Sequence, residues 1–349
     1  MLLYIHIPYC DSKCHYCSFN SFTDRSQSKN DYMEALQTQL THELQSISQD
    51  SIESVFIGGG TPSTIAPQAY EPIFEMLEGY LQEGCEVTSE ANPNSATLAW
   101  LEGMKSLGVN RMSFGVQSFN ETKLKLLNRS HTPQIAREAI INAHKIGFEN
   151  LSLDIIYNVA GDSKALLLED IKQAFELPIN HISAYELTIE ENTIFEKSPQ
   201  MRVENLEIAH LIRDEITHRG FDQYEVSNYG SYQSKHNLGY WQLKNYLGVG
   251  AGAVGFVNNQ RLYPHSNLDA YIDNPLHKEI EELSSEDILL EKLFLGLRSR
   301  VGVDQNLLTP AMQQRANILV KEQKLTLKNH IYYNIDYLLS DEIALYITT

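Results

Sequence analysis

The feature that most constrains the fold of this 349-residue chain is a regular alternation of strand-like and helix-like segments in its first two-thirds. Each of six short apolar runs is followed by a segment with apolar residues at helical spacing. Such alternation predicts a parallel sheet with helical connections. Six units are fewer than the eight of a closed barrel, so we expect an open, partial (β/α)6 barrel. The predicted strands cover residues 2–8, 54–59, 86–93, 111–119, 150–159 and 181–189, and the predicted helices cover residues 31–47, 70–81, 96–107, 132–146 and 165–175.

Polar residues and glycines follow these strands at the points where each strand is expected to end. In folds of this kind the reactive groups collect at the carboxyl ends of the strands. Each such feature is weak alone, because a glycine-rich turn is usually only a turn and a strand-end carboxylate is often a cap. Five in successive units favour a shared site. They are the cysteine loop after the first strand, Gly58–Thr61 after the second, Glu90 and Asn92 on the third, Gln117 on the fourth, and Asp154 on the fifth.

Three cysteines, Cys10, Cys14 and Cys17, form a C-x3-C-x2-C loop directly after the first predicted strand. Three thiolates suit neither a disulfide pair nor a closed tetrahedral zinc site, which has four nitrogen or sulfur ligands. They suit a [4Fe–4S] cluster in which one iron has no protein ligand. Such an iron can bind a small molecule, so the loop predicts a cofactor site.

Other interpretations of the cysteines stay open at this point. Zinc remains an alternative if His6 or His15 supplies a fourth ligand, and the thiols can also be incidental. Cys85 stands alone at the start of a strand-like run and is expected to be a half-buried apolar residue. Four cysteines in the chain, with no signal-peptide pattern after Met1, predict a reduced, cytoplasmic protein.

The composition argues against two classes of partner. The formal net charge of -18 disfavours nucleic acid, because phosphate binding needs a basic surface. No apolar run approaches the roughly 20 residues that span a bilayer, so membrane association is expected only through partner proteins.

The combination of Tyr4-x-His-Ile-Pro-x-Cys-x3-Cys-x2-Cys with Gly58-Gly-Gly-Thr-Pro-Ser resembles the radical S-adenosylmethionine (SAM) proteins of the coproporphyrinogen-dehydrogenase-like group. The resemblance covers nearly the whole chain and implies that the three cysteines hold a [4Fe–4S] cluster and that SAM chelates its open iron. It also implies SAM contacts for one set of residues and second-SAM contacts for another. The first set is Tyr4, Gly59, Gly60, Thr61 and Glu90, and the second is Gln117, Arg129 and Asp154.

Two branches of this group differ at positions that the sequence contains. The oxygen-independent coproporphyrinogen oxidases extend the cysteine motif by a fourth cysteine where this chain has Phe19, and they carry an N-terminal extension. The haem chaperones called HemW resemble this chain at both points and carry His-Asn-x-x-Tyr-Trp, found here at His236–Trp241. A neutral imidazole can bind haem iron and aromatic side chains can cover a macrocycle, so His236 is a candidate axial ligand.

One motif is a false lead. Gly250-Ala-Gly252-Ala-Val-Gly255 matches the dinucleotide fingerprint G-x-G-x-x-G but lacks the βαβ surroundings and a suitably placed acidic residue. We therefore do not expect a nucleotide there.

The character of the chain changes near residue 275. Ser284 followed by Glu286 and Asp287 is a typical helix start, and two helical segments and two short strands follow it. This order resembles the C-terminal part of the same family and predicts a small α+β, winged-helix-like domain. We expect domains at residues 1–275 and 276–349.

Together these observations favour a haem chaperone that uses a SAM-chelated [4Fe–4S] cluster and transfers haem to an acceptor protein. The enzymatic alternative is a radical SAM decarboxylase that converts coproporphyrinogen III to protoporphyrinogen IX. A third interpretation is an iron–sulfur and SAM module with an unrelated substrate. We expect haem binding on a radical SAM scaffold rather than coproporphyrinogen dehydrogenation, and assign no catalytic residue.

Overall fold

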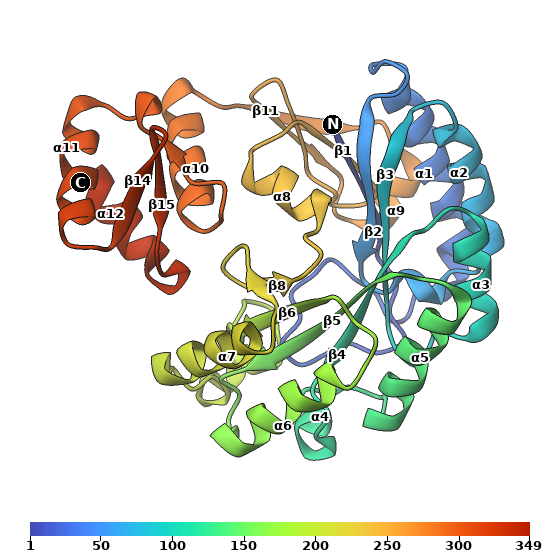
Figure 1. Cartoon of the computed structure of the whole chain (residues 1–349). Coiled ribbons are helices and arrows are strands. Elements are labelled where there is room, and N and C mark those ends of the chain that lie inside the picture. The colour runs from blue at the N-terminus through green and yellow to red at the C-terminus, as the bar shows by residue number, and fades with distance from the viewer.

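Six parallel strands in sequence order form the centre of a large sheet in the computed structural model, which describes residues 1–349. Figure 1 shows them curving around a central space, with the connecting helices outside. The predicted strands are therefore confirmed, with ends that differ by a few residues. Their bounds are β1 (Leu2–Ile7), β2 (Ile52–Gly59), β3 (Leu81–Ala91), β4 (Arg111–Gln117), β5 (Asn150–Tyr157) and β6 (His181–Glu186).

The predicted helices are also present, and several begin at a side-chain cap. Thr97, Thr132 and Ser163 each accept a hydrogen bond from a backbone N–H of the first turn. The segment predicted as a helix over 70–81 ends earlier, because Gly79 adopts a left-handed conformation (φ +83°) and β3 begins two residues later. The helices are α1 (Lys29–Leu44), α2 (Glu71–Leu77), α3 (Leu98–Ser106), α4 (Glu121–Leu126), α5 (Pro133–Ile146), α6 (Lys164–Phe175) and α7 (Leu206–His218).

Alternating side chains give the two faces of the sheet opposite character. Ile5, Val55 and Leu153 are fully buried in the apolar core. The intervening positions face the barrel interior and are mostly polar from β3 onward, as Glu90 and Asp154 illustrate. The outer face therefore supplies the stability of the fold, and the inner face supplies its chemistry.

The sheet continues beyond the six predicted strands on both sides. Strand β9 (Tyr246–Val249) pairs parallel with β1, and β8 (Asn228–Gly230) pairs antiparallel with β6. The twelve strands run from β12 at one edge to β7 at the other, so the sheet is open, as expected for a partial barrel. The additional elements are β7 (Asp222–Gln223), α8 (Lys235–Trp241), β10 (Gly255–Val257), β11 (Gln260–Pro264), α9 (Leu268–Asp273) and β12 (Lys278–Glu282).

The C-terminal segment has a separate apolar core and lies to one side of the barrel (Figure 1). Its three-stranded antiparallel sheet has the order β13-β15-β14, and α10 begins with a capping box between Ser284 and Asp287. We propose a two-domain division, with the boundary placed after β12 because that strand pairs with β11 in the large sheet. The elements are α10 (Ser285–Leu297), β13 (Val303–Asp304), α11 (Pro310–Lys321), β14 (Leu325–Lys328), β15 (Ile331–Asn334) and α12 (Ser340–Thr348).

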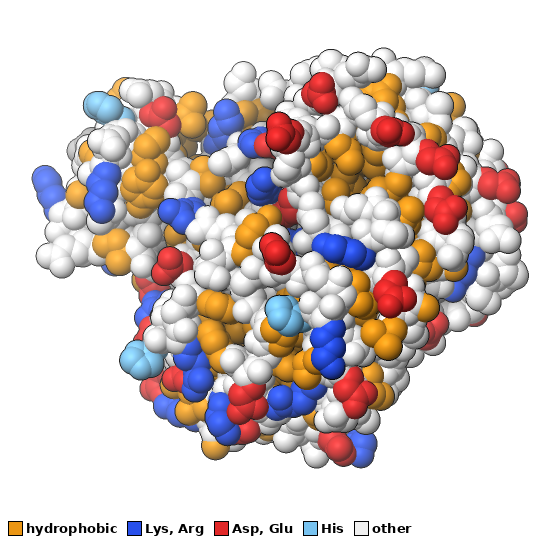
Figure 2. Space-filling model, turned by 45° about the vertical axis from the view of Figure 1, so that its right-hand side comes forward, with side chains coloured by type: hydrophobic (Ala, Val, Ile, Leu, Met, Phe, Trp, Pro, Cys, Tyr) orange, Lys and Arg blue, Asp and Glu red, His pale blue; other side chains and the backbone are white.

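Negative charge is unevenly distributed over the surface. Between Lys29 and Lys105 the chain contains no Lys or Arg, whereas Asp and Glu recur. Figure 2 shows mainly acidic side chains across the side of the molecule that carries α1–α3. A phosphate backbone would be repelled from this side. None of the helices is both long and apolar enough to span a bilayer.

Candidate functional site

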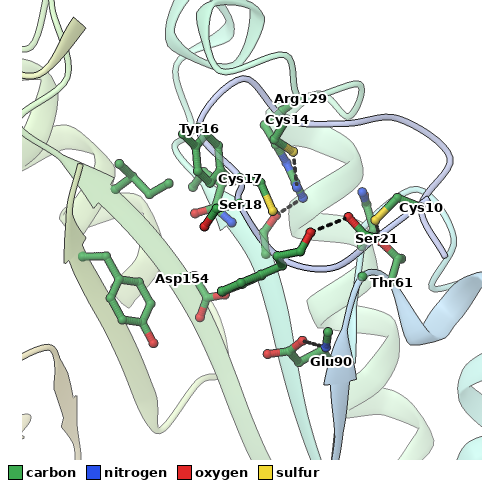
Figure 3. A pocket seen from close by; sticks show the side chains of 18 of the residues that line it. Cys10, Cys14, Tyr16, Cys17, Ser18, Ser21, Thr61, Glu90, Arg129 and Asp154 are labelled. Atoms are coloured by element: carbon green, nitrogen blue, oxygen red, sulfur yellow. Dashed lines mark hydrogen bonds between the residues drawn. The ribbon is translucent and has the colours of Figure 1, made fainter. Parts of the chain in front are cut away.

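The cysteine loop is fixed by backbone hydrogen bonds to segments far along the chain. After β1, Cys10 N–H donates to the carbonyl oxygen of Phe22, and His15 N–H donates to that of Leu127. Phe195 N–H in turn donates to the carbonyl oxygen of His15. The loop is therefore held in place from both sides, and all three cysteines line one cavity at the carboxyl ends of the strands (Figure 3).

Two of the three sulfur atoms have a polar neighbour that can donate to a thiolate. Arg129 Nη1 lies 3.3 Å from Cys14 Sγ, and Thr61 Oγ1 lies 3.4 Å from Cys10 Sγ. Burial raises the pKa of Cys17. A hydroxyl and a guanidinium in these positions can donate hydrogen bonds to thiolate ligands of a cluster. The donor set therefore fits an iron–sulfur cluster with three protein ligands.

The zinc alternative finds no support in the positions of the two candidate histidines. His6 Nδ1 contacts Tyr4 Oη at 2.8 Å, and its Nε2 contacts the carbonyl oxygen of Asn20 at 2.8 Å. His15 Nδ1 contacts the carbonyl oxygen of Leu126 at 3.0 Å. No three His, Cys, Asp or Glu side chains converge on a single ion position.

Cys85 lies near the middle of β3, five residues before Glu90, and is 8 % exposed. It is not among the residues that line the cysteine cavity. Burial raises its pKa to about 11. The structure thus places Cys85 as a buried apolar residue of the core, where the sequence predicted a half-buried one.

The glycine turn after β2 lets the backbone approach the cysteine loop closely. A Cβ atom on Gly60 would lie 2.8 Å from the carbonyl oxygen of Tyr9 and 2.9 Å from that of Ile7. Gly59 has φ +111° and donates its N–H to Glu90 Oε2 at 3.1 Å. These residues and Thr61 line the cavity, so this turn joins the cysteine loop to β3.

Two buried carboxyl groups face the cysteines across the cavity, as Figure 3 shows for Glu90 and Asp154. Burial, and then the charge of Asp154, raises the pKa of Glu90 to about 8. Burial raises the pKa of Asp154 to about 6, although the Ser183 hydroxyl and Arg111 oppose the shift. Both groups can therefore bind a cationic ligand as carboxylates after losing a proton.

Gln117 and Arg129 reach the same cavity from a distorted strand end. Gln117 has φ +69°, and the pairing of β4 with β5 shifts register between Phe114 and Gln117. Arg129 Nη2 donates to the carbonyl oxygen of Gly115, where a Cβ atom would lie 3.2 Å from that nitrogen. The glycine therefore leaves room for the guanidinium beside Cys14.

The cavity has a volume of about 530 Å³ and brings together seven of the eight predicted SAM contacts. Tyr4 is the exception: its hydroxyl contacts His6, and burial raises its pKa. Sequence reasoning also missed cavity residues on and after β6, namely Tyr185, Glu186 and Glu190. The alternation in β6 could have found Tyr185, which follows His181 and Ser183 on the inner face, but it gives no signal for Glu186 or Glu190.

His236 lies at the other end of the barrel. Its Nδ1 contacts Ser54 Oγ at 2.9 Å, and Ser54 pairs in register with Leu2 at the start of β1. The imidazole is 1 % exposed, and its Nε2 has no hydrogen-bond partner. Burial, followed by the charge of Arg111, lowers its pKa to about 3, so the ring is neutral.

Aromatic side chains surround this imidazole. The ring of Phe56 lies 5.2 Å from that of His236, and the ring of Tyr240 lies 4.7 Å away in an edge-on arrangement. Helix α8 itself packs closely on β1, because a Cβ atom on Gly239 would lie 2.7 Å from Leu2. The motif therefore closes the amino-terminal end of the barrel.

A buried carboxylate that sequence reasoning did not single out anchors this motif. Glu86 is 2 % exposed and accepts four hydrogen bonds. Its Oε1 accepts from Ser234 Oγ (3.1 Å) and His236 N–H (3.1 Å), and its Oε2 accepts from Tyr232 Oη (2.7 Å) and Lys235 N–H (2.9 Å). Its partners lie about 150 residues away in sequence, so no local pattern could reveal the role.

The G-x-G-x-x-G stretch turns between β9 and β10, and its amides are already bonded within the protein. Gly250 N–H donates to Gln39 Oε1 at 2.9 Å, and Gly252 N–H donates to the carbonyl oxygen of His265. No free amides remain at these two positions to cradle a phosphate.

Comparisons with known proteins identify relatives of this chain. A model of the radical SAM superfamily matches residues 4–174. The haem chaperone HemW of Bacillus subtilis is 33 % identical over 319 residues, which cover 86 % of this chain and 84 % of that protein. The haem chaperone HemW of Escherichia coli is 38 % identical over 266 residues, which cover 73 % of this chain and 70 % of that protein.

One solved structure matches over the whole chain. The coproporphyrinogen III oxidase HemN of Escherichia coli, a radical SAM enzyme, superposes with a TM-score of 0.83 and covers 100 % of this chain and 90 % of its own. Its sequence identity is 19 %, so the likeness establishes the fold alone.

Proposed function

The chain belongs to the HemW family of haem chaperones in the radical SAM superfamily, and from this premise we propose that it binds haem and transfers it to an acceptor protein. We assign the [4Fe–4S] cluster to Cys10, Cys14 and Cys17, and SAM to the cavity beside them. We infer a cytoplasmic location from the four free cysteines.

The cavity supports SAM binding through its charge. SAM carries positive charge on its ammonium and sulfonium groups, and Glu90 and Asp154 offer two carboxyl groups at the cavity wall. The Gly59–Thr61 turn supplies close backbone approach, and Arg129 and Thr61 hold the cysteine sulfurs. When bound, the cluster would supply an open iron for SAM to chelate. Tyr4 remains a proposed contact that lies outside the present cavity wall.

The observation that carries the chaperone function over decarboxylation is the acidity of this cavity. Coproporphyrinogen III carries four carboxylates, which free cationic side chains would bind favourably. The cavity instead presents four acidic residues, namely Glu90, Asp154, Glu186 and Glu190, of which Glu186 is paired with Arg202. Its two cations are engaged internally: Lys13 donates to the Phe19 carbonyl oxygen at 2.7 Å, and Arg129 binds Cys14 and Gly115.

The proposed haem ligand is Nε2 of His236. In haem and metal sites a ligating imidazole usually has its other nitrogen hydrogen-bonded, as Nδ1 is here to Ser54. The remaining nitrogen is neutral and unpartnered, which is the state that binds iron. Because the ring is 1 % exposed, haem coordination requires helix α8 to move.

The test is a pair of assays on one anaerobically reconstituted sample. Titration with haem should give saturable binding of about one haem per chain, followed by transfer to an apo-haem protein. Incubation with coproporphyrinogen III, SAM and a reductant should give no protoporphyrinogen IX. Repeated turnover of the decarboxylation without haem binding would instead establish the oxidase.

A further inference from the structure

The start of helix α8 is anchored by hydrogen bonds to one buried carboxylate, Glu86. The helix has seven residues, too few to be stable in isolation. Three of the four donors to Glu86 are on Ser234, Lys235 and His236, at the start of the helix. The fourth is the hydroxyl of Tyr232, two residues before Ser234. These four bonds tie the amino-terminal end of the motif to β3.

The closed position and haem coordination exclude each other. His236 Nε2 is buried between Phe56 and Tyr240, and a macrocycle cannot reach it while α8 packs on β1. An unpartnered buried nitrogen has a desolvation cost that a bound metal ion would remove. In this structure, therefore, haem cannot reach His236, although its Nε2 has no hydrogen-bond partner and could coordinate iron.

We propose that Glu86 is the latch of the haem site: its four hydrogen bonds hold residues 232–236 in the haem-excluding state, and their release exposes His236 to haem. This inference rests on the proposed function, since it takes His236 as the haem ligand. Ser54 keeps Nδ1 engaged while the motif is closed. Glu86 acts through His236 and touches no haem atom, so it is a positioning residue.

The direction of the change in haem affinity follows from the fraction of molecules in which residues 232–236 are open. When only the open state binds, the apparent dissociation constant equals the intrinsic constant divided by the open fraction. Glu86→Gln keeps the shape of the side chain but places an amide N–H2 group against donors. The open fraction therefore rises, and haem binds more tightly in the variant than in the wild type. Substitution of a residue that is needed only for folding would instead weaken haem binding.

The experiment compares haem titrations of the reconstituted full chain, followed by the Soret band. Glu86→Gln should lower the apparent dissociation constant about tenfold and leave the Soret position unchanged. Tyr232→Phe removes one donor to Glu86 and should lower the apparent dissociation constant for haem about threefold. This second variant tests the proposal if Glu86→Gln does not fold. Glu43→Gln is the matched control, because Glu43 is also a buried carboxylate (5 % exposed) but pairs with Lys278 on β12. It should leave haem affinity unchanged.

Hydrogen exchange provides a second measurement on the wild type. The amides of Lys235 and His236 both donate to Glu86 and should be protected without haem. One equivalent of haem should accelerate their exchange. Unchanged or stronger protection with haem would overturn the latch, as would unchanged or weaker haem affinity in both Glu86→Gln and Tyr232→Phe.

The outcomes separate the latch from the function on which it rests. If the wild type binds haem and His236→Ala loses it, while neither latch variant binds more tightly, the latch is wrong and the haem ligand stands. If haem binds equally well without His236, both the axial role and the latch are wrong. If the wild type binds no haem, the chaperone function is wrong as well.

Discussion

The two ends of the barrel contain similar side chains, but these line an open cavity at one end and are buried within the protein at the other. At the carboxyl end, Glu90, Asp154 and the three cysteines line a cavity of about 530 Å³. At the amino-terminal end, Glu86 and His236 are almost fully buried. Glu86 and Glu90 face the same interior four residues apart, or about 13 Å along β3. One strand thus contributes a carboxylate to each end.

This difference indicates two modes of ligand binding. The cysteine end is preformed, so a ligand can enter with little rearrangement of the chain. The histidine end is closed by internal hydrogen bonds, so a ligand there must displace part of the protein. The following predictions test whether the two ends behave as independently as this contrast indicates.

The largest expected effect is on the cluster. Changing Cys10, Cys14 or Cys17 to Ala should abolish the reconstituted [4Fe–4S] centre, because the only other thiol, Cys85, is buried in the core outside the cysteine cavity. Iron and acid-labile sulfide analysis measures the loss. Haem affinity at the other end should change by less than about twofold if the ends are independent.

Cys85→Ala is the matched control and should retain the full iron and sulfide content. Stoichiometric zinc without labile sulfide in the wild type would contradict the cluster assignment. A large loss of haem affinity in the cluster variants would show that the two ends are coupled.

A smaller effect is expected from Gly60→Ala. The added methyl group would lie within 2.9 Å of backbone atoms of Ile7 and Tyr9, so the cysteine loop must shift. We expect SAM affinity, measured anaerobically by calorimetry, to fall about tenfold or more. Gly103→Ala creates a similar clash with the Pro67 side chain, away from the cavity, and should leave SAM affinity unchanged. Equal SAM affinity in the Gly60 variant would remove this turn from the site.

The smallest expected effect is on the number of protons that are released when SAM binds. The pKa of Glu90 is raised from 4.5 to about 8, so between these pH values the folded protein binds more protons than the unfolded chain. Its ionisation therefore lowers the free energy of unfolding as the pH rises through this window. A cationic ligand beside the carboxylate reverses the shift, so SAM binding should release about one proton at pH 7.

Calorimetry in buffers of different ionisation enthalpy measures this release. In Glu90→Gln the release should be smaller than in the wild type by about one proton, and in the wild type SAM affinity should increase between about pH 6 and pH 8. A binding enthalpy that does not depend on the buffer would contradict the assignment of Glu90 to the SAM site.

The sequence predicted the strands and helices of the six repeated units because local periodicity determines them. It did not predict β9–β12, because β9 pairs with β1 from more than 240 residues away and its pattern is short. The helix predicted over 70–81 was too long because Gly79 breaks it. The formation of these strands depends on a distant partner strand, and the end of this helix depends on backbone conformation, so local sequence periodicity does not determine either.

The candidate site was predictable where residues follow strand ends directly. Gly59, Glu90 and Asp154 reach one cavity because parallel strands end at one edge of the sheet. Tyr185 and Glu186 escaped notice because aromatic and acidic residues are common at strand ends. The burial of His236 and its dependence on Glu86 arise only when α8 folds back onto the start of β2 and β3.

The measurement that tests the central claim most directly is haem binding by the reconstituted wild type beside His236→Ala. The account predicts about one haem per chain with a Soret band shifted from free haemin. In His236→Ala, haem affinity should fall about tenfold or more, or the Soret band should move, while iron and sulfide stay at wild-type levels. An unchanged Soret band and affinity in the variant would contradict the axial role, and no haem binding by the wild type would contradict the chaperone function itself.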